Sequence, residues 1–519
     1  MFSFPLHEIY SSKFILDFIA GDISLANFIS TDYQLKDFKS QLSKKDFSIE
    51  KRRILSEVIA SQYESTGLPN PESLELLLAE NTFTVTTGHQ LCLFGGPQYF
   101  IHKIISVISL ANKLKVAYPE YNFIPIFWMA SEDHDFDEIS SVKIFNKNIK
   151  VEGENSRPVG RIPTKEFSSS LELLEQLFKN DSRGEHLISI FKEAFNKNNW
   201  ADCTRYWVNQ LFKKHGLVIV DADSLQLKNI FSSIIELEIK DQFIYNQVEK
   251  TNKELVELGY KPQVNPREIN LFYILDGERI RIIFENNQFR IGDDFYSEIQ
   301  ICDLIKSNPE NFSPNVLMRP LYQECILPNL AYIGGPAEIA YWGQLKGVFN
   351  VSNILFPKLL LRDHFGWINK ADLAWWKSNQ LDEKDLLVDF DVLANKIILK
   401  DKTLSFDLEN DMEQIRIKFQ NEIAAIDPSI LGMLNGELAK FQKGLNKIQS
   451  KLNSASKRKN ELFYNKVKKI QKSLIINKVL NERVDGFIPV YVNLDKDYLK
   501  SLIEFSNPFE SNLKIIVKD

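Results

Sequence analysis

Apolar runs in the first two thirds of the chain predict strands that alternate with helices. Phe83–Thr86, Phe123–Ala130 and His215–Asp221 are short, apolar and rich in β-branched or aromatic residues, so each indicates a buried strand. Residues 98–115 carry a helical pattern between the first two strands. Strand, helix and strand at this spacing are typical of parallel pairing, and we expect an α/β core around a doubly wound parallel sheet.

The segments around these strands follow other patterns. Residues 1–80 place apolar side chains at helical spacing, whereas residues 271–292 alternate as antiparallel hairpins with Asp276-Gly277 and Asn286-Asn287 as turns. We therefore expect a helical N-terminal segment and a core that is interrupted twice. The predicted boundaries are residues 1–80 for the N-terminal segment, 81–380 for the core, 140–210 and 225–315 for its insertions, 381–480 for a helical domain and 481–519 for a segment returning to the core.

The predicted helical domain has the apolar pattern of a coiled coil. One stripe runs from Met412 to Ile426, and a second, from Leu434 to Leu452, repeats at steps of four and three residues, as a heptad seam does. Because Asp427-Pro428 supplies a cap and a first helical residue, we expect one continuous helix from Pro428 to Lys478. Such a helix would be about 75 Å long. The Met412–Ile426 helix covers part of it, and a second subunit is expected to cover the rest.

This second helix is locally basic. Between Lys440 and Lys478 there are twelve Lys or Arg residues and one acid, Glu461. A solvated coiled-coil face and a surface for RNA both fit such a charge run. The net charge of the whole chain, −6, and the lack of interleaved stacking side chains favour the coiled-coil face.

Composition narrows the class of protein further. The 519 residues include four cysteines, and none of them has the spacing of zinc ligands. The N-terminus lacks a signal-peptide pattern, and no apolar run is long enough for a membrane span. We therefore expect a cytoplasmic protein and assign no metal ligands.

A glycine-rich joint, TTGHQLCLFGGPQYFIHK at residues 86–103, follows the first strand. In doubly wound sheets this strand end faces the crevice where ligands bind. We expect Pro97 to be the first helical residue, so that the N–H groups of Gln98 and Tyr99 form an anion site. A tight turn without a ligand is the alternative, because the joint is neither a G-x-G-x-x-G nor a Walker A motif. The predicted nucleotide- and phosphate-binding residues are Gly88, Gln90, Gly95, Gly96, Pro97, Gln98 and Lys103.

An acidic block, SEDHDFDEI at residues 131–139, follows the second strand. Because parallel strands end at the same edge of a sheet, we expect this block to lie close to the glycine-rich joint. Its side chains could bind a metal, hold an amine or a ribose hydroxyl, or cap the next helix. The predicted catalytic residues are His89 from the joint, and Asp133, His134 and Asp135 from the acidic block.

A third block, GGPAEIAYWGQLKGVF at residues 334–349, repeats the Gly-Gly-Pro joint before a helix. Glu338, Tyr341 and Trp342 are spaced to share one helix face, and a carboxylate beside two aromatic rings suits a substrate ammonium or a sugar. The alternative is that Tyr341 and Trp342 pack into the core. Two arginines in apolar surroundings, in LMRPLYQECILP and PKLLLRDHF, need carboxylate or phosphate partners. The predicted substrate-binding residues are Arg319, Gln323, Glu338, Tyr341, Trp342 and Arg362.

Together these blocks resemble the cysteine-adding enzymes of bacillithiol biosynthesis, a family of cysteine ligases. The resemblance rests on TTGHQ…FGGPQYFIHK, WMASEDHDFDEI, RPLYQECILP and GGPAEIAYWGQL, and it extends over nearly the whole chain. It implies a Rossmann-like core of the class I aminoacyl-tRNA synthetase type with two connecting-peptide insertions, and a coiled coil that contributes to a homodimer. The implied reaction joins L-cysteine through an amide bond to the amine of glucosaminyl-malate, with ATP and Mg²⁺ expected for activation of the cysteine carboxyl group.

The chain departs from cysteinyl-tRNA synthetase at three signatures. Phe94-Gly95-Gly96-Pro97 stands where that enzyme has a His-Ile-Gly-His-like sequence, so the first histidine is missing. The Lys-Met-Ser-Lys-Ser signature and the cysteine-rich zinc site are absent as well. A non-catalytic nucleotide- or thiol-binding protein with a synthetase-like core is therefore the second hypothesis, and the charged residues at three strand ends favour the enzyme.

Overall fold

The computed structural model describes residues 1–30, 34–179, 181–400, 408–494 and 497–518. The chain divides into two compact units. The first comprises residues 1–365 and 482–515, and the second comprises residues 366–481 with the last few residues of the chain. The predicted core boundary at residue 380 therefore lies inside the second unit.

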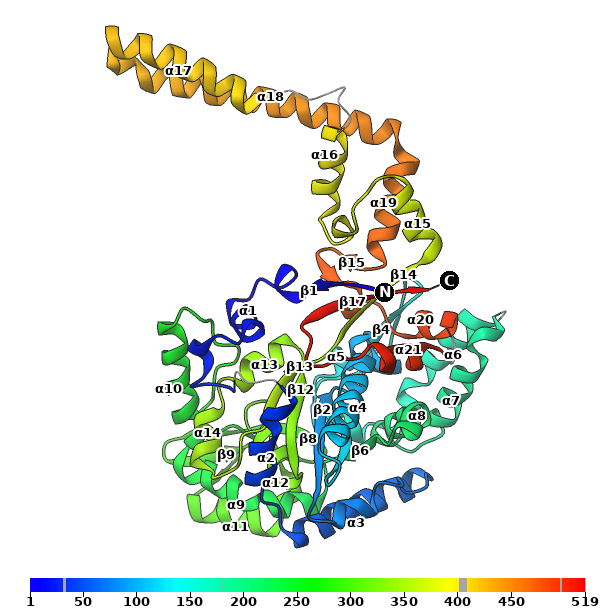
Figure 1. Ribbon diagram of the computed structural model, residues 1–519. Coiled ribbons are helices and arrows are strands. Elements are labelled where there is room, and N and C mark those ends of the chain that lie inside the picture. Colours follow the sequence, from blue (N-terminus) through cyan, green and yellow to red (C-terminus); the bar gives the residue numbers. More distant parts are fainter. Residues whose placement is uncertain (31–33, 180, 401–407, 495–496, 519) are drawn as a thin grey trace. The chain divides into compact units, whose positions relative to one another are not determined.

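The first unit is built on a five-stranded sheet whose strand order is β13-β12-β2-β3-β6 (Figure 1). All neighbouring strands are parallel, which confirms the predicted parallel α/β core. The chain proceeds from β2 through β3 to β6 and then returns to the other side of β2, so the order reverses between β2 and β12. Ligands bind at such a reversal. The strands are β2 (Thr82–His89), β3 (Asn122–Met129), β6 (Val218–Asp221), β12 (Asn329–Gly334) and β13 (Lys358–Leu361).

The glycine-rich joint differs from its prediction. Strand β2 continues to His89, and helix α4 spans Tyr99–Ala117, so Pro97 is not the first helical residue. Pro97 instead forms an isolated antiparallel bridge with Gly486, and the N–H of Gln98 donates to the carbonyl of Asp485 over 3.1 Å. Because the C-terminal segment occupies these backbone groups, the predicted open N–H of Gln98 is not available to an anion.

Two long segments interrupt the parallel sheet. The segment between β3 and β6 contains α5 (Phe136–Ile139), the hairpin of β4 (Ser141–Ile144) and β5 (Lys147–Lys150), α6 (Ser168–Phe178), α7 (Glu185–Phe195) and α8 (Trp200–Phe212). The segment between β6 and β12 contains α9 (Leu225–Asp241), α10 (Phe243–Glu257), α11 (Glu298–Ser307) and α12 (Arg319–Ile326).

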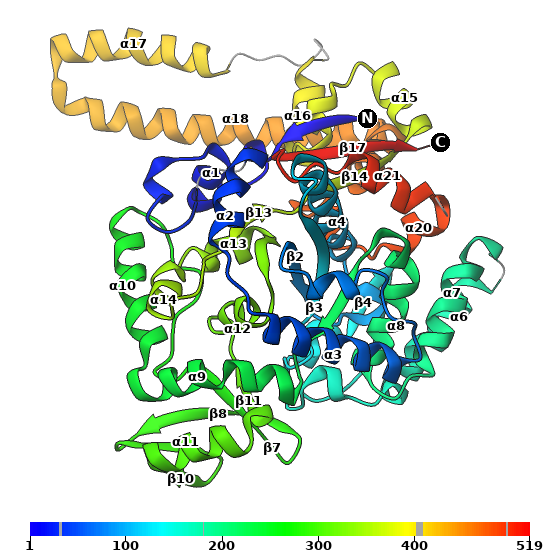
Figure 2. The ribbon, with the colours of Figure 1, turned by 60° about the horizontal axis from the view of Figure 1, so that its bottom comes forward.

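The second of these segments also carries an antiparallel sheet, with α11 beside it (Figure 2). The predicted hairpins at 271–292 are confirmed, with Asp276-Gly277 and Asn286-Asn287 at positive φ in the turns. These turns prefer Asn, Asp and Gly because both central residues have positive φ. The strands are β7 (Leu271–Leu275), β8 (Glu278–Glu285), β9 (Gln288–Ile291), β10 (Asp294–Tyr296) and β11 (Phe312–Pro314).

The two ends of the chain add to the first unit. The predicted helices of residues 1–80 are present as α1 (Lys13–Ala20), α2 (Phe38–Lys44) and α3 (Ile49–Thr66). An unpredicted strand, β1 (Phe2–Pro5), precedes them and pairs antiparallel with β17 (Asn512–Lys518), beginning at Phe2 opposite Ile515. After α13 (Pro336–Trp342) comes α14 (Lys346–Val351), and near the C-terminus lie α20 (Ile488–Leu494) and α21 (Asp497–Phe505).

The second unit is helical, and α17 (Leu408–Ile426) lies along α18 (Leu431–Lys459) (Figure 1). The predicted continuous helix from Pro428 to Lys478 is wrong. Asn460 leaves the helical conformation between α18 and α19 (Glu461–Lys472), and a small hairpin of β15 (Ile475–Ile476) and β16 (Val479–Leu480) follows. The hairpin turn has Asn477 and Lys478 at positive φ. The unit also contains α15 (Lys370–Ser378) and α16 (Phe390–Lys400).

None of the helices in the described ranges combines the length and the apolar character that a membrane crossing requires.

Candidate active site

A cavity of about 600 Å³ lies in the first unit at the carboxyl ends of β2, β3, β12 and β13. One side is formed by these strand ends and by α4 and α13, and another by the segment between β6 and β12. The order of the strands reverses between β2 and β12, so the cavity is at the position expected of a ligand site. The predicted site residues that line it are Gly88, His89, Gln90, Lys103, Asp133, His134, Arg319, Glu338, Tyr341 and Arg362.

A partly buried ion pair joins the two sides of the strand-order reversal. Lys103 from α4 lies 2.5 Å from Glu338 Oε2 and donates to the carbonyl of Gly88 over 2.8 Å. Glu338 also accepts from Tyr332 Oη at 2.5 Å and from the N–H of Gly335 at 2.8 Å. Burial raises the pKa of Glu338, but Lys103 and these donors outweigh it and hold the pKa below its usual value. Glu338 is therefore ionised and fixed, with Lys103 as its counterion.

Arg319, at the start of α12, is a partly buried cation of the cavity. Its guanidinium donates to Gln323 Oε1 over 3.0 Å and lies 3.5 Å from Tyr341 Oη. The rings of Trp128 and Tyr332 are 5.8 and 5.5 Å from its central carbon. In the described part of the chain no carboxylate pairs with it. An arginine among aromatic rings without a counterion is suited to bind a ligand carboxylate or phosphate.

His89 is the last residue of β2 and is 7% exposed. Its Nδ1 is 2.8 Å from the carbonyl oxygen of Gln90, so Nδ1 carries the hydrogen and Nε2 is left as an acceptor. Burial, assisted by the charge of Lys103, lowers the pKa of His89 to about 3. The imidazole is therefore neutral near pH 7, and its edge contacts Phe100 at 5.0 Å between centroids.

Asp133 of the acidic block contacts Gln90, which follows β2, and Arg279 of the antiparallel sheet. Gln90 Nε2 donates to Asp133 Oδ2 over 2.5 Å, and Arg279 Nη1 lies 3.4 Å from Oδ1. Arg279 Nη1 also lies 2.9 Å from His134 Nδ1. Burial raises the pKa of Asp133, but the His134 hydrogen bonds and Arg279 outweigh it and hold the pKa well below its usual range.

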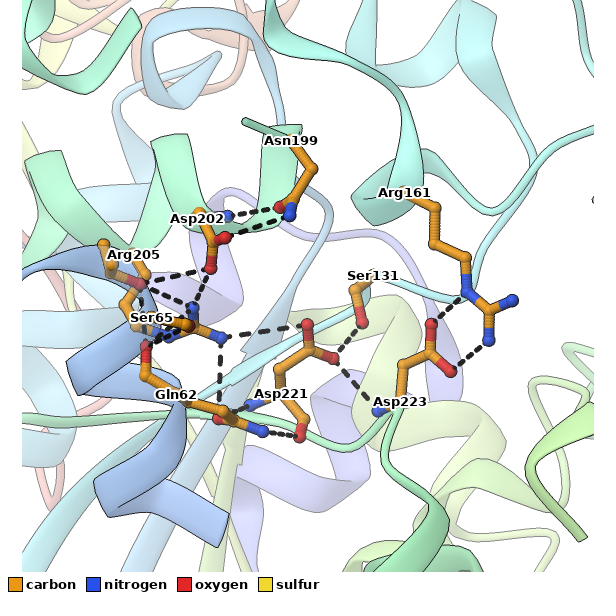
Figure 3. Close-up of polar contacts among 10 residues, drawn as sticks. Gln62, Ser65, Ser131, Arg161, Asn199, Asp202, Arg205, Asp221 and Asp223 are labelled. Atoms are coloured by element: carbon orange, nitrogen blue, oxygen red, sulfur yellow. Dashed lines mark hydrogen bonds and ion pairs between the residues drawn. The ribbon is translucent and has the colours of Figure 1, made fainter. Parts of the chain in front are cut away.

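A second polar network lies behind the acidic block, at the end of β6 (Figure 3). Asp221 accepts a hydrogen bond from Ser131 Oγ and another from the N–H of Asp223 at 3.0 Å, and Arg205 Nη2 is 3.8 Å away. Asp223 binds Arg161 through two hydrogen bonds of 2.6 and 2.7 Å. Burial, together with the neighbouring charge of Asp223, raises the pKa of Asp221 to about 6. This network fixes Ser131, the first residue of the acidic block.

The buried carboxylate of Glu482 supports the end of β13. Arg362 Nη2 donates to Glu482 Oε1 over 2.6 Å, and the same carboxylate accepts from His364 Nδ1 at 2.7 Å and from His102 Nδ1 at 2.9 Å. Burial raises the pKa of Glu482, but Arg362 and the histidines hold it well below its usual value, and burial lowers the pKa of His364 to about 4. Both histidines are therefore neutral near pH 7, and Arg362 is the counterion of Glu482.

Several predicted site residues do not line the cavity. The glycine-rich joint at residues 95–98 (Gly95, Gly96, Pro97 and Gln98) lies beside the C-terminal segment instead. Gly96 has φ 58°, Pro97 forms the bridge with Gly486, and the N–H of Gln98 donates to Asp485. Asp135 caps α5 by accepting from the N–H of Glu138 over 3.1 Å.

Two more predicted substrate contacts are core residues. Trp342 is fully buried and stacks on Tyr332 at 4.6 Å between centroids, so the core alternative holds for this side chain. Gln323 is buried behind Arg319 and orients its guanidinium. Neither residue lines the cavity.

The cavity also contains residues that were not predicted. Their signals in the sequence are weak, because each is a single charged or aromatic residue in an ordinary segment. Tyr99, Glu132 and Glu138 do belong to the glycine-rich joint and the acidic block that the sequence singled out. The unpredicted lining residues that carry charge or an aromatic ring are Tyr99, Trp128, Glu132, Glu138, Arg267, Phe272, Arg279, Tyr332 and Arg483. Within the described ranges, no three His, Cys, Asp or Glu side chains are grouped as metal ligands.

Comparison with known proteins gives matches over both units. Residues 3–363 match the family model described as bacillithiol biosynthesis BshC, N-terminal Rossmann-like domain, and residues 367–517 match the C-terminal coiled-coil domain of the same family. A protein of Flavobacterium johnsoniae named "Putative cysteine ligase BshC" is 38% identical over 517 residues, which are 98% of this chain and 97% of the relative.

Two further relatives carry the same name. The one from Flavobacterium psychrophilum is 35% identical over 520 residues, with 98% of this chain and 97% of the relative covered. The one from Bacillus cytotoxicus is 29% identical over 434 residues, with 79% of each chain covered.

Proposed function

Because this chain belongs to the BshC family of bacillithiol biosynthesis, we propose that it is a cysteine ligase that joins L-cysteine to the amine of glucosaminyl-malate. The product of this reaction is bacillithiol, and the new bond is an amide. One observation carries the proposal most directly. At the strand-order reversal, the unpaired guanidinium of Arg319 lies close to the fixed carboxylate of Glu338, as a substrate with both carboxylates and an amine requires.

The reaction needs an activated carboxyl group, because an amine does not attack a free carboxylate at a useful rate. ATP with Mg²⁺ is the proposed source of activation, through either an acyl-adenylate or an acyl-phosphate. The phosphate groups would meet Arg362 and Arg483, whose guanidinium carbons lie 5.1 and 5.4 Å from the ring of Tyr99. These two arginines replace the Gly95–Gln98 joint as the proposed phosphate contacts, because the joint does not line the cavity.

Other residues of the cavity are assigned to the charged groups of the substrates, a carboxylate and an ammonium, and to the nucleotide. Arg319 would bind a carboxylate of the malate moiety, oriented by Gln323. Glu338, whose side chain keeps 23% of its surface exposed, would hold an ammonium group. His89, as a neutral acceptor at Nε2, and Asp133, as a fixed carboxylate, would orient the nucleotide or the amine.

The test is direct. Purified protein is incubated with ATP, magnesium, L-cysteine and glucosaminyl-malate, and mass spectrometry is used to detect bacillithiol, AMP and ADP. Bacillithiol with stoichiometric AMP supports an adenylate, and ADP supports an acyl-phosphate. A His89→Ala or Asp133→Asn variant that retains its circular dichroism spectrum should make no product, and full activity in both would refute their assignment. A folded wild type that makes no bacillithiol would refute the ligase.

The second unit supports a homodimer as part of the proposal. Its helices α17 and α18 carry large apolar side chains that are open to solvent, with Phe441 55% and Ile448 57% exposed on the predicted heptad seam. A second copy of the chain is the proposed cover for this seam. Size-exclusion chromatography with light scattering should give a dimer mass for the wild type and a monomer mass for Phe441→Asp. A cytoplasmic location is proposed as well, since all four cysteines are free thiols.

A further inference from the structure

Four carboxylates line the cavity, and three of them are already engaged. Glu132 forms an ion pair with the buried Lys228. Asp133 accepts from Gln90, from its neighbour's N–H and from Arg279, and Glu338 accepts from Lys103, Tyr332 and Gly335. Each of these acids neutralises a cation or holds a backbone segment in place. A proton acceptor must instead have an oxygen that the substrate can reach.

The fourth carboxylate, Glu138, is not engaged. In the described part of the chain its side chain accepts no hydrogen bond and forms no ion pair. Its position is nevertheless well defined, because α5 is capped by Asp135 and anchored by the buried side chains of Phe136 and Ile139. The N–H of Phe136 also donates to Asn155 Oδ1 over 2.5 Å. A rigid short helix therefore presents an unpaired carboxylate at the cavity.

We propose that Glu138 is the proton acceptor for the attacking amine in the ligation step. The assignment rests on the proposed function. The amine nitrogen forms a bond to the carbonyl carbon of the activated cysteine, and its proton moves to a Glu138 oxygen. The bond between that carbon and the phosphate oxygen breaks, and its electron pair leaves with the phosphate or AMP that the nucleoside triphosphate supplied. Glu138 then returns the proton to water.

The electrostatics of the cavity favour Glu138 over the other candidates. Burial raises the pKa of Glu138, and the charges of Asp133 and Asp135 raise it further against the opposing effect of Lys103. His89, with a pKa of about 3, and Asp133, with a pKa well below its usual range, are weaker bases. A general base is most effective when its pKa is close to the working pH. The titratable groups that face Glu138 are Asp133, Asp135, Lys103, Glu338, Tyr99 and Cys92.

The experiment compares Glu138→Gln with Asp137→Asn. Asp137 is a matched control because it is an exposed acid on the same helix and does not line the cavity. Bacillithiol formation is measured as a function of pH, and activation of cysteine is measured separately with hydroxylamine, which captures the activated acyl group as a hydroxamate. Glu138→Gln should lower kcat for bacillithiol by at least about 100-fold and should remove the acidic limb of the pH profile.

Hydroxamate formation distinguishes the proposed role from a structural one. Neutral hydroxylamine needs no base, so Glu138→Gln should form hydroxamate at the wild-type rate, and Asp137→Asn should match the wild type in both assays. Glu138→Asp should recover part of the ligation rate. Loss of hydroxamate in Glu138→Gln, or ligation within threefold of the wild type, would overturn the assignment while the ligase stands. A wild type that makes hydroxamate but no bacillithiol would refute the proposed function and this role with it.

Discussion

The Lys103–Glu338 pair should be strongly coupled, and a double-mutant cycle can measure the coupling. Lys103→Met removes the ammonium group and leaves the Glu338 carboxylate with Tyr332 and Gly335 as donors. Glu338→Gln leaves the ammonium of Lys103, which is 4% exposed, with the carbonyl of Gly88 as acceptor. Each single change therefore leaves one charge of this partly buried pair without its counterion, and the double change leaves none.

The structure gives the expected size of these effects. Loss of one partner of a buried ion pair lowers the free energy of unfolding by about 3 kcal/mol or more, whereas loss of both partners leaves no unpaired charge. If each single variant and the double variant lose about 3 kcal/mol, the coupling energy is about 3 kcal/mol. The pH dependence should change as well. In the wild type the pKa of Glu338 is lowered, so its contribution to stability is lost as the pH falls. Without Lys103 that pKa rises, and stability is lost as the pH rises.

The assay is urea denaturation of the full chain at several pH values, followed by tryptophan fluorescence, since Trp128 and Trp342 lie close to the pair. The transition of the first unit is compared among the wild type, both single variants and the double variant. Additive losses, with a coupling energy below about 0.5 kcal/mol, would show that solvent screens the pair and would refute the reasoning.

Three further predictions concern other positions. Burial raises the pKa of Glu238 from 4.5 to about 7, so the stability that its protonated form provides falls as the pH rises. Between pH 5 and pH 8 the unfolding free energy of the wild type should therefore drop by about 2.5 kcal/mol more than that of Glu238→Gln, and equal slopes would contradict this pKa. Gly96→Ala would place a Cβ 2.7 Å from Cys92 Cβ, so its free energy of unfolding should fall by more than about 2 kcal/mol. Gly216→Ala is also at positive φ but in open space, and its free energy of unfolding should fall by only about 1 kcal/mol in the same denaturation assay. Arg319→Lys should weaken malate binding about 10-fold or more in isothermal titration calorimetry, because lysine cannot form the two parallel hydrogen bonds, and unchanged affinity would exclude Arg319 as the carboxylate contact.

The sheet could be predicted because its strands leave a direct trace in the sequence. Buried parallel strands such as Phe123–Ala130 are continuous apolar runs, and the hairpin turns at Asp276-Gly277 and Asn286-Asn287 require residues that tolerate positive φ. Strand β1 has no such trace, because it consists of four residues that pair only with the far end of the chain. The break at Asn460 was missed for a related reason, since apolar spacing continues through a single non-helical residue.

The strand ends of the cavity were predicted for a general reason, and its opposite wall was not. Gly88 lies at the end of β2, and Asp133 and Glu338 follow β3 and β12 of the same parallel sheet, so the topology alone brings them to one edge. Arg279 approaches Asp133 from an antiparallel sheet whose placement the sequence does not encode locally. Glu138 belongs to the acidic block but was not predicted as a site residue, because only the structure shows which of the block's carboxylates are already paired.

Glu482 shows most clearly what lies beyond local sequence patterns. It stands in an ordinary stretch, NERVDG, 120 residues after Arg362, and the second unit is formed almost entirely by the chain between them. Arg362 lines the cavity, and its guanidinium is fully buried on the side of Glu482. An unpaired buried guanidinium is strongly destabilising. The wall at the end of β13 is therefore complete only after the chain has passed through the second unit and returned. This gives the C-terminal segment a role in the first unit, because Glu482 neutralises Arg362 and the next residue, Arg483, lines the same cavity.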